Sequence, residues 1–184
     1  LPVAKLLVRW ALGTQPGTVL DPSFGGCSFL RAAADHLETL GIVDTAKYVV
    51  GVDIDPAAQT HLGSLNSGAP RATGRIANFF LTRGSALPGA PFSAIVGNPP
   101  YIRHHRFGGQ DRKLAQEAIA PSGVRVPQNA NAWVYFVVHA SAMLRKHGKL
   151  ALILPGAVLH AMYARPLYPH IERHFSESRL IYLR

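Results

Sequence analysis

Three short apolar segments, each closed by a polar turn, constrain the fold of this chain most strongly. Residues 18–20 are followed by Asp21-Pro22, residues 48–54 end in Asp53-Ile54, and residues 92–96 lead into Asn98-Pro99. Segments with helical spacing of apolar residues lie between them. This alternation predicts an α/β fold with a doubly wound, mostly parallel sheet. Because parallel strands end on one edge, we expect the three turns to share a ligand-binding rim.

The other elements follow from apolar periodicity and from the positions of glycine and proline. The 184 residues fit one domain, and we expect a single domain over residues 1–184. The predicted helices cover residues 3–12, 29–40, 56–66, 112–119, 131–145 and 163–175, the last bent at its prolines. The predicted strands cover residues 18–20, 48–54, 75–77, 92–96, 150–154 and 180–183.

The turn Asn98-Pro99-Pro100-Tyr101 is rigid, polar and tipped by an aromatic ring. Neither proline has an amide hydrogen, so the preceding strand must end there. Asn98 supplies a side-chain carbonyl, and Tyr101 supplies a flat ring with a polar end. Fixed acceptors beside a ring suit a planar ligand that donates through an exocyclic amine. A plain Asn-Pro turn with a core tyrosine is the simpler reading of the turn in isolation.

Two acidic residues end the first two apolar segments. Asp21 opens a glycine-containing turn, where Gly25 allows a ligand to approach the backbone closely. Asp21 could there contact a cationic amino group. Asp53 lies about 30 residues further on, where an acid commonly binds ribose hydroxyls. Since Asp55 suits the cap of the next helix, we expect Asp53 to be left for the ligand.

Composition favours a polyanionic partner and excludes several classes of protein. Nineteen Lys and Arg against ten Asp and Glu give a net charge of +9, which is typical of nucleic-acid binding. Five of the Lys and Arg residues and two histidines lie in residues 102–129, where glycines and prolines are interspersed, and we expect this segment to form a mobile, basic excursion. No apolar run reaches the roughly 20 residues of a membrane span. The single Cys27 excludes an internal disulfide and fits a reducing compartment.

Other reactive side chains receive structural interpretations. Cys27 is interpreted as a small buried residue, since no base is paired with it. The adjacent His104 and His105 point in different directions and have no carboxylate at ligand spacing, so we expect no metal site. The aromatic residues Trp133, Tyr135 and Phe136 are expected to lie mainly in the core.

The three turns together resemble a known enzyme family. In chain order the motifs are Asp21-Pro22-(x)2-Gly25-(x)3-Phe29-Leu30, Gly51-Val52-Asp53-Ile54-Asp55-Pro56 and Asn98-Pro99-Pro100-Tyr101-Ile102-Arg103. This pattern resembles the S-adenosylmethionine-dependent adenine-N6 DNA methyltransferases of restriction-modification systems, over nearly the whole chain. The resemblance implies a Rossmann-like methyltransferase fold and a prokaryotic, cytoplasmic enzyme.

The resemblance also assigns roles to the cofactor motifs. Asp21, Pro22 and the Gly25 turn would hold the methionine part of S-adenosylmethionine. Asp53 would take the ribose hydroxyls, and Ile54 would pack on the adenine. In the family an acid followed by an aromatic residue contacts the adenine amine, and Asn78-Phe79 is the matching pair here. Two positions depart from the family pattern, since Asn78 replaces the acid and Cys27 stands where a glycine is common.

For catalysis the resemblance points to the tetrad of residues 98–101. The Asn98 side-chain oxygen and the Pro99 carbonyl would accept the two hydrogens of the adenine amine, while Tyr101 stacks on the base. The lone pair on nitrogen would then be localised for direct attack on the methyl group. Pro100 completes the rigid turn. The basic residues Arg103, His104, His105 and Arg106 would contact DNA phosphates.

Alternatives of other classes stay open at this point. A glutamine-N5 methyltransferase of protein substrates shares the same tetrad, and small RNA methyltransferases are a further option. A degenerate domain that binds DNA or acts as a scaffold is the non-enzymatic alternative. We expect the chain to be a catalytic fragment without the last strands, with target recognition in a missing C-terminal region or a separate specificity subunit. Weak DNA binding by the chain alone is therefore expected.

Overall fold

The computed structural model describes residues 2–181 of the chain. Its residues group into two compact units. The first consists of residues up to 99 together with 143–153, and the second of residues 100–142 together with those from 154 onward. The expectation of one catalytic domain over residues 1–184 stays a prediction.

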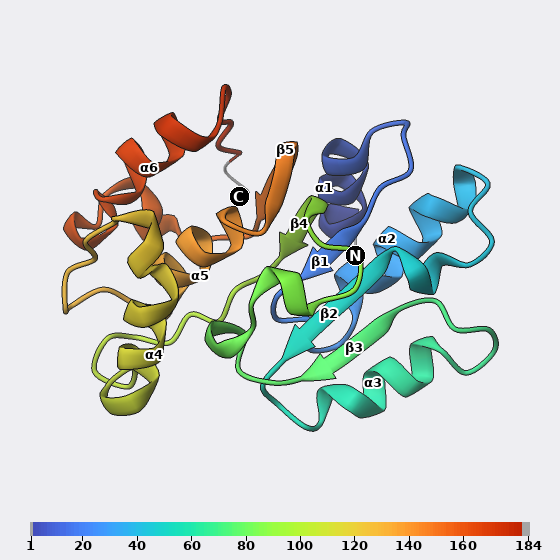
Figure 1. The fold of residues 1–184 in the computed structure, drawn as a ribbon, viewed down its shortest axis with the longest axis horizontal. Coiled ribbons are helices and arrows are strands. Elements are labelled where there is room, and N and C mark those ends of the chain that lie inside the picture. The colour runs from blue at the N-terminus through green and yellow to red at the C-terminus, as the bar shows by residue number, and fades with distance from the viewer. Residues whose placement is uncertain (1, 182–184) are drawn as a thin grey trace. The chain divides into compact units, whose positions relative to one another are not determined.

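The first unit contains all the strands of the described sheet (Figure 1). Its strands are β1 Val19–Asp21, β2 Val49–Asp53, β3 Thr73–Ile76, β4 Phe92–Gly97 and β5 Leu144–Leu152, and its α-helices are α1 Pro2–Leu12, α2 Ser28–Thr39 and α3 Ala58–Leu65. The order in the sheet is β3-β2-β1-β4-β5, and every pair is parallel. The predicted α/β fold with a parallel sheet is therefore confirmed.

The strand order reverses between β1 and β4, which lie side by side. From β1 the chain proceeds through β2 to β3 on one side, whereas β4 and β5 lie on the other. Ligands bind outside the carboxyl ends of strands at such a reversal. The turns after β1, β2 and β4 all lie at this edge, as the sequence predicts.

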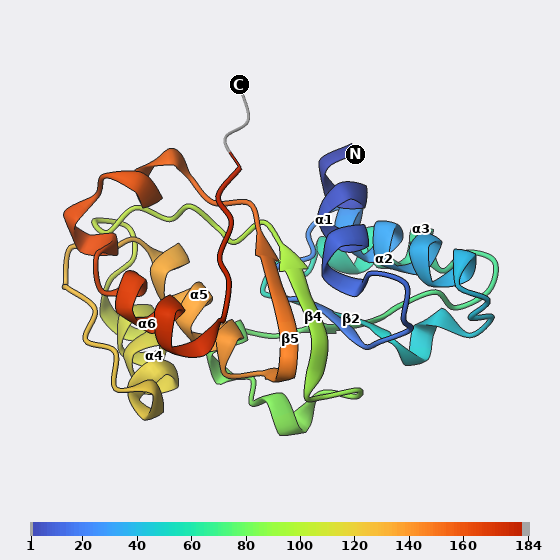
Figure 2. The same ribbon diagram turned by 90° about the horizontal axis from the view of Figure 1, so that it is seen from above.

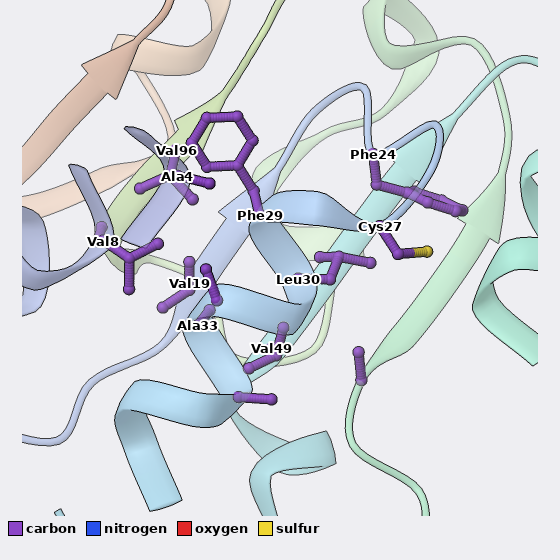
Figure 3. Close-up of a cluster of buried hydrophobic side chains, with 14 of the residues drawn as sticks. Ala4, Val8, Val19, Phe24, Cys27, Phe29, Leu30, Ala33, Val49 and Val96 are labelled. Atoms are coloured by element: carbon purple, nitrogen blue, oxygen red, sulfur yellow. The ribbon is translucent and has the colours of Figure 1, made fainter. Parts of the chain in front are cut away.

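Helices α1 and α2 pack together on one face of the sheet (Figure 2). Their small and aliphatic residues, among them Ala4, Val8 and Ala33, meet Val19 and Val49 from the central strands (Figure 3). These side chains are 5% exposed or less. Burying each aliphatic side chain contributes about 1.5–3 kcal/mol. This packing holds the central strands, and hence the turns at their carboxyl ends, in a fixed position.

Several predicted boundaries change in the structure. The predicted helix over 131–145 is wrong at its end, because α5 stops at Ser141 and Leu144 pairs with Phe92 as the start of β5. Strand pairing therefore overrides the helical pattern of these residues. A register irregularity follows before Lys149 pairs with Ala94. Of the predicted strand 180–183, residues 180 and 181 form no strand and the others lie outside the described residues.

The second unit contains α4 Gly109–Ile119, α5 Ala132–Ser141 and α6 Leu167–His174. Trp133, Tyr135 and Phe136 of α5 are 7% exposed or less, which confirms their predicted place in the core. The helix predicted over 163–175 is interrupted at Pro166, because a 3-10 turn over Met162–Ala164 precedes α6, whereas Pro169 lies inside α6 without breaking it. Across residues 2–181, every helix is too short or too polar to cross a membrane.

Candidate functional site

Asp21, at the end of β1, is buried with one carboxylate oxygen unpaired. The residue is 1% exposed. Its Oδ1 accepts a hydrogen bond from the Ser23 amide at 3.1 Å, whereas the buried Oδ2 has no partner among the described residues. Burial raises the pKa of Asp21 to about 8, the Ser23 amide lowers it, and the Asp53 charge raises it further. A buried carboxylate of this kind is costly unless a cation pairs with it.

Asp53, at the end of β2, organises the neighbouring turns. Its Oδ2 accepts from the Gly25 amide at 2.8 Å, and its Oδ1 accepts from the Asp55 amide at 2.9 Å. Asp53 thus also holds two backbone amides, and its expected role toward a ligand stays a prediction. Each carboxylate oxygen has a second lone pair that can still accept from a ligand hydroxyl. The Asp55 Oδ1 accepts from the Ala57 amide in the turn before α3. The helix itself begins at Ala58 with Ala57 as its N-cap residue, so the predicted helix start at Asp55-Pro56 is wrong by two residues.

The turn between β1 and α2 requires an unusual backbone at two positions. Gly25 has a φ of 41° and Cys27 a φ of 61°. An L-residue pays roughly 1–2 kcal/mol in the left-handed region, which explains why a glycine is common where this chain has Cys27. The Cys27 side chain is fully buried beside Leu30 and Phe24 (Figure 3). Burial raises the thiol pKa to about 11, so the predicted structural role of Cys27 is confirmed.

Residues that follow β2 and β3 form a mixed polar and apolar surface. Ile54 is 65% exposed, and the Asp53 carbonyl accepts from the Ala77 amide at 2.7 Å. The Asn78 side-chain oxygen accepts from the Phe80 amide at 3.0 Å and caps a short 3-10 helix. Phe79 is buried. Ile54 is thus available to pack on a ligand, and one lone pair of the Asn78 oxygen is already used.

The turn after β4 is joined to the turn after β1. The Ser23 hydroxyl donates to the Asn98 carbonyl at 3.1 Å. A Cβ added at Gly97 would lie 2.8 Å from Asp21 Oδ1, so only glycine allows the two turns to approach this closely. The Asn98 side chain is exposed, whereas Pro99 is buried. The sequence analysis did not identify Ser23 or Gly97 as residues that join the two turns. For Ser23 the one available signal was the order Asp-Pro-Ser, which is typical of a turn stabilised by a side chain.

Pro100 and Tyr101 continue the chain into the second unit. Tyr101 is 44% exposed, and Arg103, His104, His105 and Arg106 are all exposed. An open depression of about 490 Å³ is lined by Tyr101, Ile102, Arg103, His105 and Arg106. The predicted aromatic and basic side chains of this segment therefore do lie together within the second unit.

Arg112 of α4 points inward to this basic segment. Its guanidinium donates to the carbonyls of His104, Phe107 and Ala130, and it lies 5.2 Å from the centre of the Phe107 ring. Asn131 adds a bond from the His104 amide at 2.8 Å and donates to the Tyr163 hydroxyl at 2.7 Å. Hydrogen bonds from Arg112 and Asn131 thus join the backbone at His104 and Phe107 to the rest of the second unit. The expected mobility of residues 102–129 stays a prediction.

Metal ligation has no candidate cluster in the described part of the chain. Residues 2–181 contain no group of three His, Cys, Asp or Glu side chains that could hold an ion.

Comparison with known proteins agrees with the geometry. The model of the N-6 DNA Methylase family matches residues 1–177. The chain is 26% identical over 160 residues to the type II methyltransferase M.XamI of Xanthomonas campestris pv. amaranthicola, covering 85% of this chain and 28% of that protein. It is 27% identical over 163 residues to the type I restriction enzyme MjaIX methylase subunit of Methanocaldococcus jannaschii, covering 86% and 28%.

Solved structures show the same fold at low sequence identity. A type I restriction-modification methyltransferase subunit from Streptococcus thermophilus has a TM-score of 0.69 at 18% identity, covering 94% of this chain and 37% of that chain. A DrdV–DNA complex has a TM-score of 0.71 at 14% identity, covering 94% of this chain and 22% of that chain.

The chain spans 28% of the length of M.XamI and of the MjaIX subunit. On the match over residues 1–177, the chain belongs to the N-6 DNA methylase family.

Proposed function

We propose that this chain is the catalytic region of an enzyme that transfers a methyl group from S-adenosylmethionine to the N6 amino group of adenine in DNA, within a restriction-modification system. One observation carries the proposal. Ser23 joins the turn of the buried Asp21 to the turn of Asn98, through bonds of 3.1 Å to each. A cation-binding turn and an acceptor turn are thereby held at one edge of the sheet, as methyl transfer between two ligands requires.

The residues at the rim fit S-adenosylmethionine. The unpaired, buried Oδ2 of Asp21 suits the ammonium group of the methionine part. The second lone pairs of the Asp53 oxygens suit the ribose hydroxyls. The exposed Ile54 suits one face of the adenine, and Asn78 would offer an uncharged acceptor to the adenine amine. When bound, the cofactor supplies an electrophilic methyl group on a sulfonium.

Asn98 and Pro99 would activate the amine that receives the methyl group. The lone pair of an adenine amino nitrogen is delocalised into the ring and is a poor nucleophile. Two acceptors, the Asn98 side-chain oxygen and the Pro99 carbonyl, would bind the two amine hydrogens and favour a pyramidal nitrogen. Positioned acceptors of this kind act by charge complementarity in the transition state. The proton released after transfer leaves from the same nitrogen, through an acceptor or to water.

Residues 101–106 would contact the DNA. A base in a duplex must leave the stack, at a cost of a few kcal/mol. The exposed ring of Tyr101 would stack on it, which is worth about 1–3 kcal/mol. The exposed cations of residues 103–106 would contact phosphates. Recognition of a target sequence would require a further region or a specificity subunit, since the chain spans 28% of its curated relatives.

The proposal is tested by following methyl transfer in the full-length protein. The protein is incubated with S-adenosylmethionine and duplex DNA of mixed sequence, and the DNA is digested to nucleosides and separated by mass spectrometry. We expect N6-methyldeoxyadenosine, which is absent when the cofactor is omitted. N6-methyldeoxyadenosine no more abundant than in the reaction without cofactor would overturn the choice of substrate.

Arg112 should affect DNA binding without contacting DNA. Because its guanidinium holds three backbone carbonyls, Arg112→Gln should disorganise residues 104–107 and weaken DNA affinity about tenfold. The slope of log affinity against log salt should stay unchanged, whereas loss of a phosphate contact lowers it by about one. Fluorescence anisotropy at several salt concentrations measures both quantities.

The neighbouring Lys113 provides a matched control for Arg112. Its side chain is 69% exposed, and its ammonium forms an ion pair at 4.0 Å with Glu117. Lys113→Gln should therefore leave the affinity within about twofold of the wild type. A decrease of about one in the salt slope for Arg112→Gln would show instead that Arg112 contacts a phosphate.

A further inference from the structure

Ser23 uses both of its polar groups to connect two turns that are 75 residues apart in sequence. Its amide donates to Asp21 Oδ1 and its hydroxyl donates to the Asn98 carbonyl, each at 3.1 Å. The side chain is half-buried in the turn between β1 and α2. One residue thus contacts both the acid proposed to hold the cofactor and the residue proposed to hold the target amine.

The Asn98 carbonyl lies where support from the sheet ends. The last register pair of β4 joins Gly97 to Leu152, and the Gly97 carbonyl accepts from the Ile153 amide at 2.9 Å. Past this point Pro99 and Pro100 cannot donate hydrogen bonds. The Ser23 hydroxyl bonds to the first peptide group beyond the strand, and so bears on the direction in which the Asn98 side chain leaves the backbone.

The two turns are also closely packed at Gly97. A Cβ there would lie 2.8 Å from Asp21 Oδ1 and 3.3 Å from Pro22 Cδ. A shift of the Asp21 turn on ligand binding would therefore be transmitted to the turn after β4 through the Ser23 bond and through this contact.

We propose that Ser23 is a positioning residue that couples the cofactor turn to the acceptor turn and aligns Asn98 with the bound methyl donor. This inference rests on the proposed function for its catalytic consequence. Its structural part, that the hydroxyl of Ser23 sets the geometry of Asn98, stands on the hydrogen bond alone.

The catalytic test separates turnover from binding. In Ser23→Ala the hydroxyl is lost but the backbone amide that donates to Asp21 is kept. Loss of one hydrogen bond corresponds to about a tenfold effect. We expect the single-turnover rate of methyl transfer in the full-length protein to fall about tenfold, while the Kd for S-adenosylmethionine from calorimetry changes less than about threefold. Ser23→Thr, which keeps the hydroxyl, should restore the rate.

Ser64→Ala is the matched control. The Ser64 hydroxyl also donates to a backbone carbonyl, that of Thr60, but in the exposed helix α3. This variant should match the wild type in rate, cofactor affinity and melting temperature. A Ser23→Ala rate within twofold of the wild type would overturn the proposal. So would an equal loss of rate and cofactor affinity, because Ser23 would then act only on the cofactor turn.

A measurement on the unliganded chain tests the link between Ser23 and Asn98 independently of methyl transfer. The carbonyl carbon shift of Asn98, observed by NMR after selective ¹³C labelling, reports the hydrogen bond that this carbonyl accepts. We expect the signal to move in Ser23→Ala, to return in Ser23→Thr and to stay in place in Ser64→Ala. An unmoved signal in Ser23→Ala refutes the inference, whether or not the protein methylates DNA. A moved signal without any methyl transfer leaves the structural coupling intact and overturns the proposed function.

Discussion

Asn98→Ala should abolish methyl transfer while leaving cofactor affinity nearly intact. The side chain is exposed at the end of β4, whereas the backbone is held by the sheet and by Ser23. Truncation therefore removes the side-chain acceptor and keeps the backbone hydrogen bonds that hold the turn. Loss of a preorganised group that acts on the transition state costs about 10²–10³ in rate. We expect a fall of that size in the single-turnover rate, and a Kd for S-adenosylmethionine within about threefold of the wild type.

Asn98→Asp provides the chemical comparison. A carboxylate keeps an acceptor oxygen at nearly the same place but adds a charge and removes the amide donor. If the side chain acts as an acceptor, the Asp variant should retain more activity than the Ala variant. An Ala variant with more than about a tenth of the wild-type rate would be inconsistent with the role proposed for Asn98. Equal melting temperatures for the three proteins would exclude unfolding as the cause.

The rim of the site could be predicted from sequence because its signals are local. Asp21-Pro22 and Asn98-Pro99 must end strands, since proline has no amide hydrogen. Once the strands are parallel, their carboxyl ends share an edge without further information. The structure confirms the sheet and the order of these turns. The roles assigned to individual site residues stay predictions.

Long-range pairings were outside the reach of sequence reasoning. Nothing near Ser23 indicates that its hydroxyl meets a carbonyl 75 residues away. Arg112 looked like one more cation in a basic segment, because charge does not reveal that three carbonyls lie within reach. Leu144 continued a helical pattern, but pairing with Phe92 placed it in a strand. In each case a tertiary contact overrides or completes a local preference.

Asp21→Asn should weaken cofactor binding strongly and at the same time stabilise the unliganded chain. Removing one partner of a buried charge pair costs about 2–5 kcal/mol, so the Kd for S-adenosylmethionine should rise at least about thirtyfold. In the unliganded chain the same carboxylate has an unpaired, buried oxygen. Replacing it with an uncharged amide should raise the free energy of unfolding by about 1–3 kcal/mol at pH 9. If Asp21→Asn weakens cofactor binding and also raises the free energy of unfolding, then Asp21 serves ligand binding and not the stability of the fold.

The pH dependence of this stabilisation follows from the raised pKa of Asp21. The pKa is about 8 in the folded chain and 3.8 in the absence of burial. Between these values the folded state holds a proton that the unfolded state has lost, so stability decreases as pH rises from about 4 to 8. The gain in free energy of unfolding from Asp21→Asn should therefore be largest above pH 8 and small at pH 5, as measured by urea unfolding.

The exposed Asp111 in the first turn of α4 serves as a control, and Asp111→Asn should change the free energy of unfolding little at either pH. An advantage of Asp21→Asn that is greater at pH 5 than at pH 9 would show that the Asp21 carboxylate is paired in the unliganded protein.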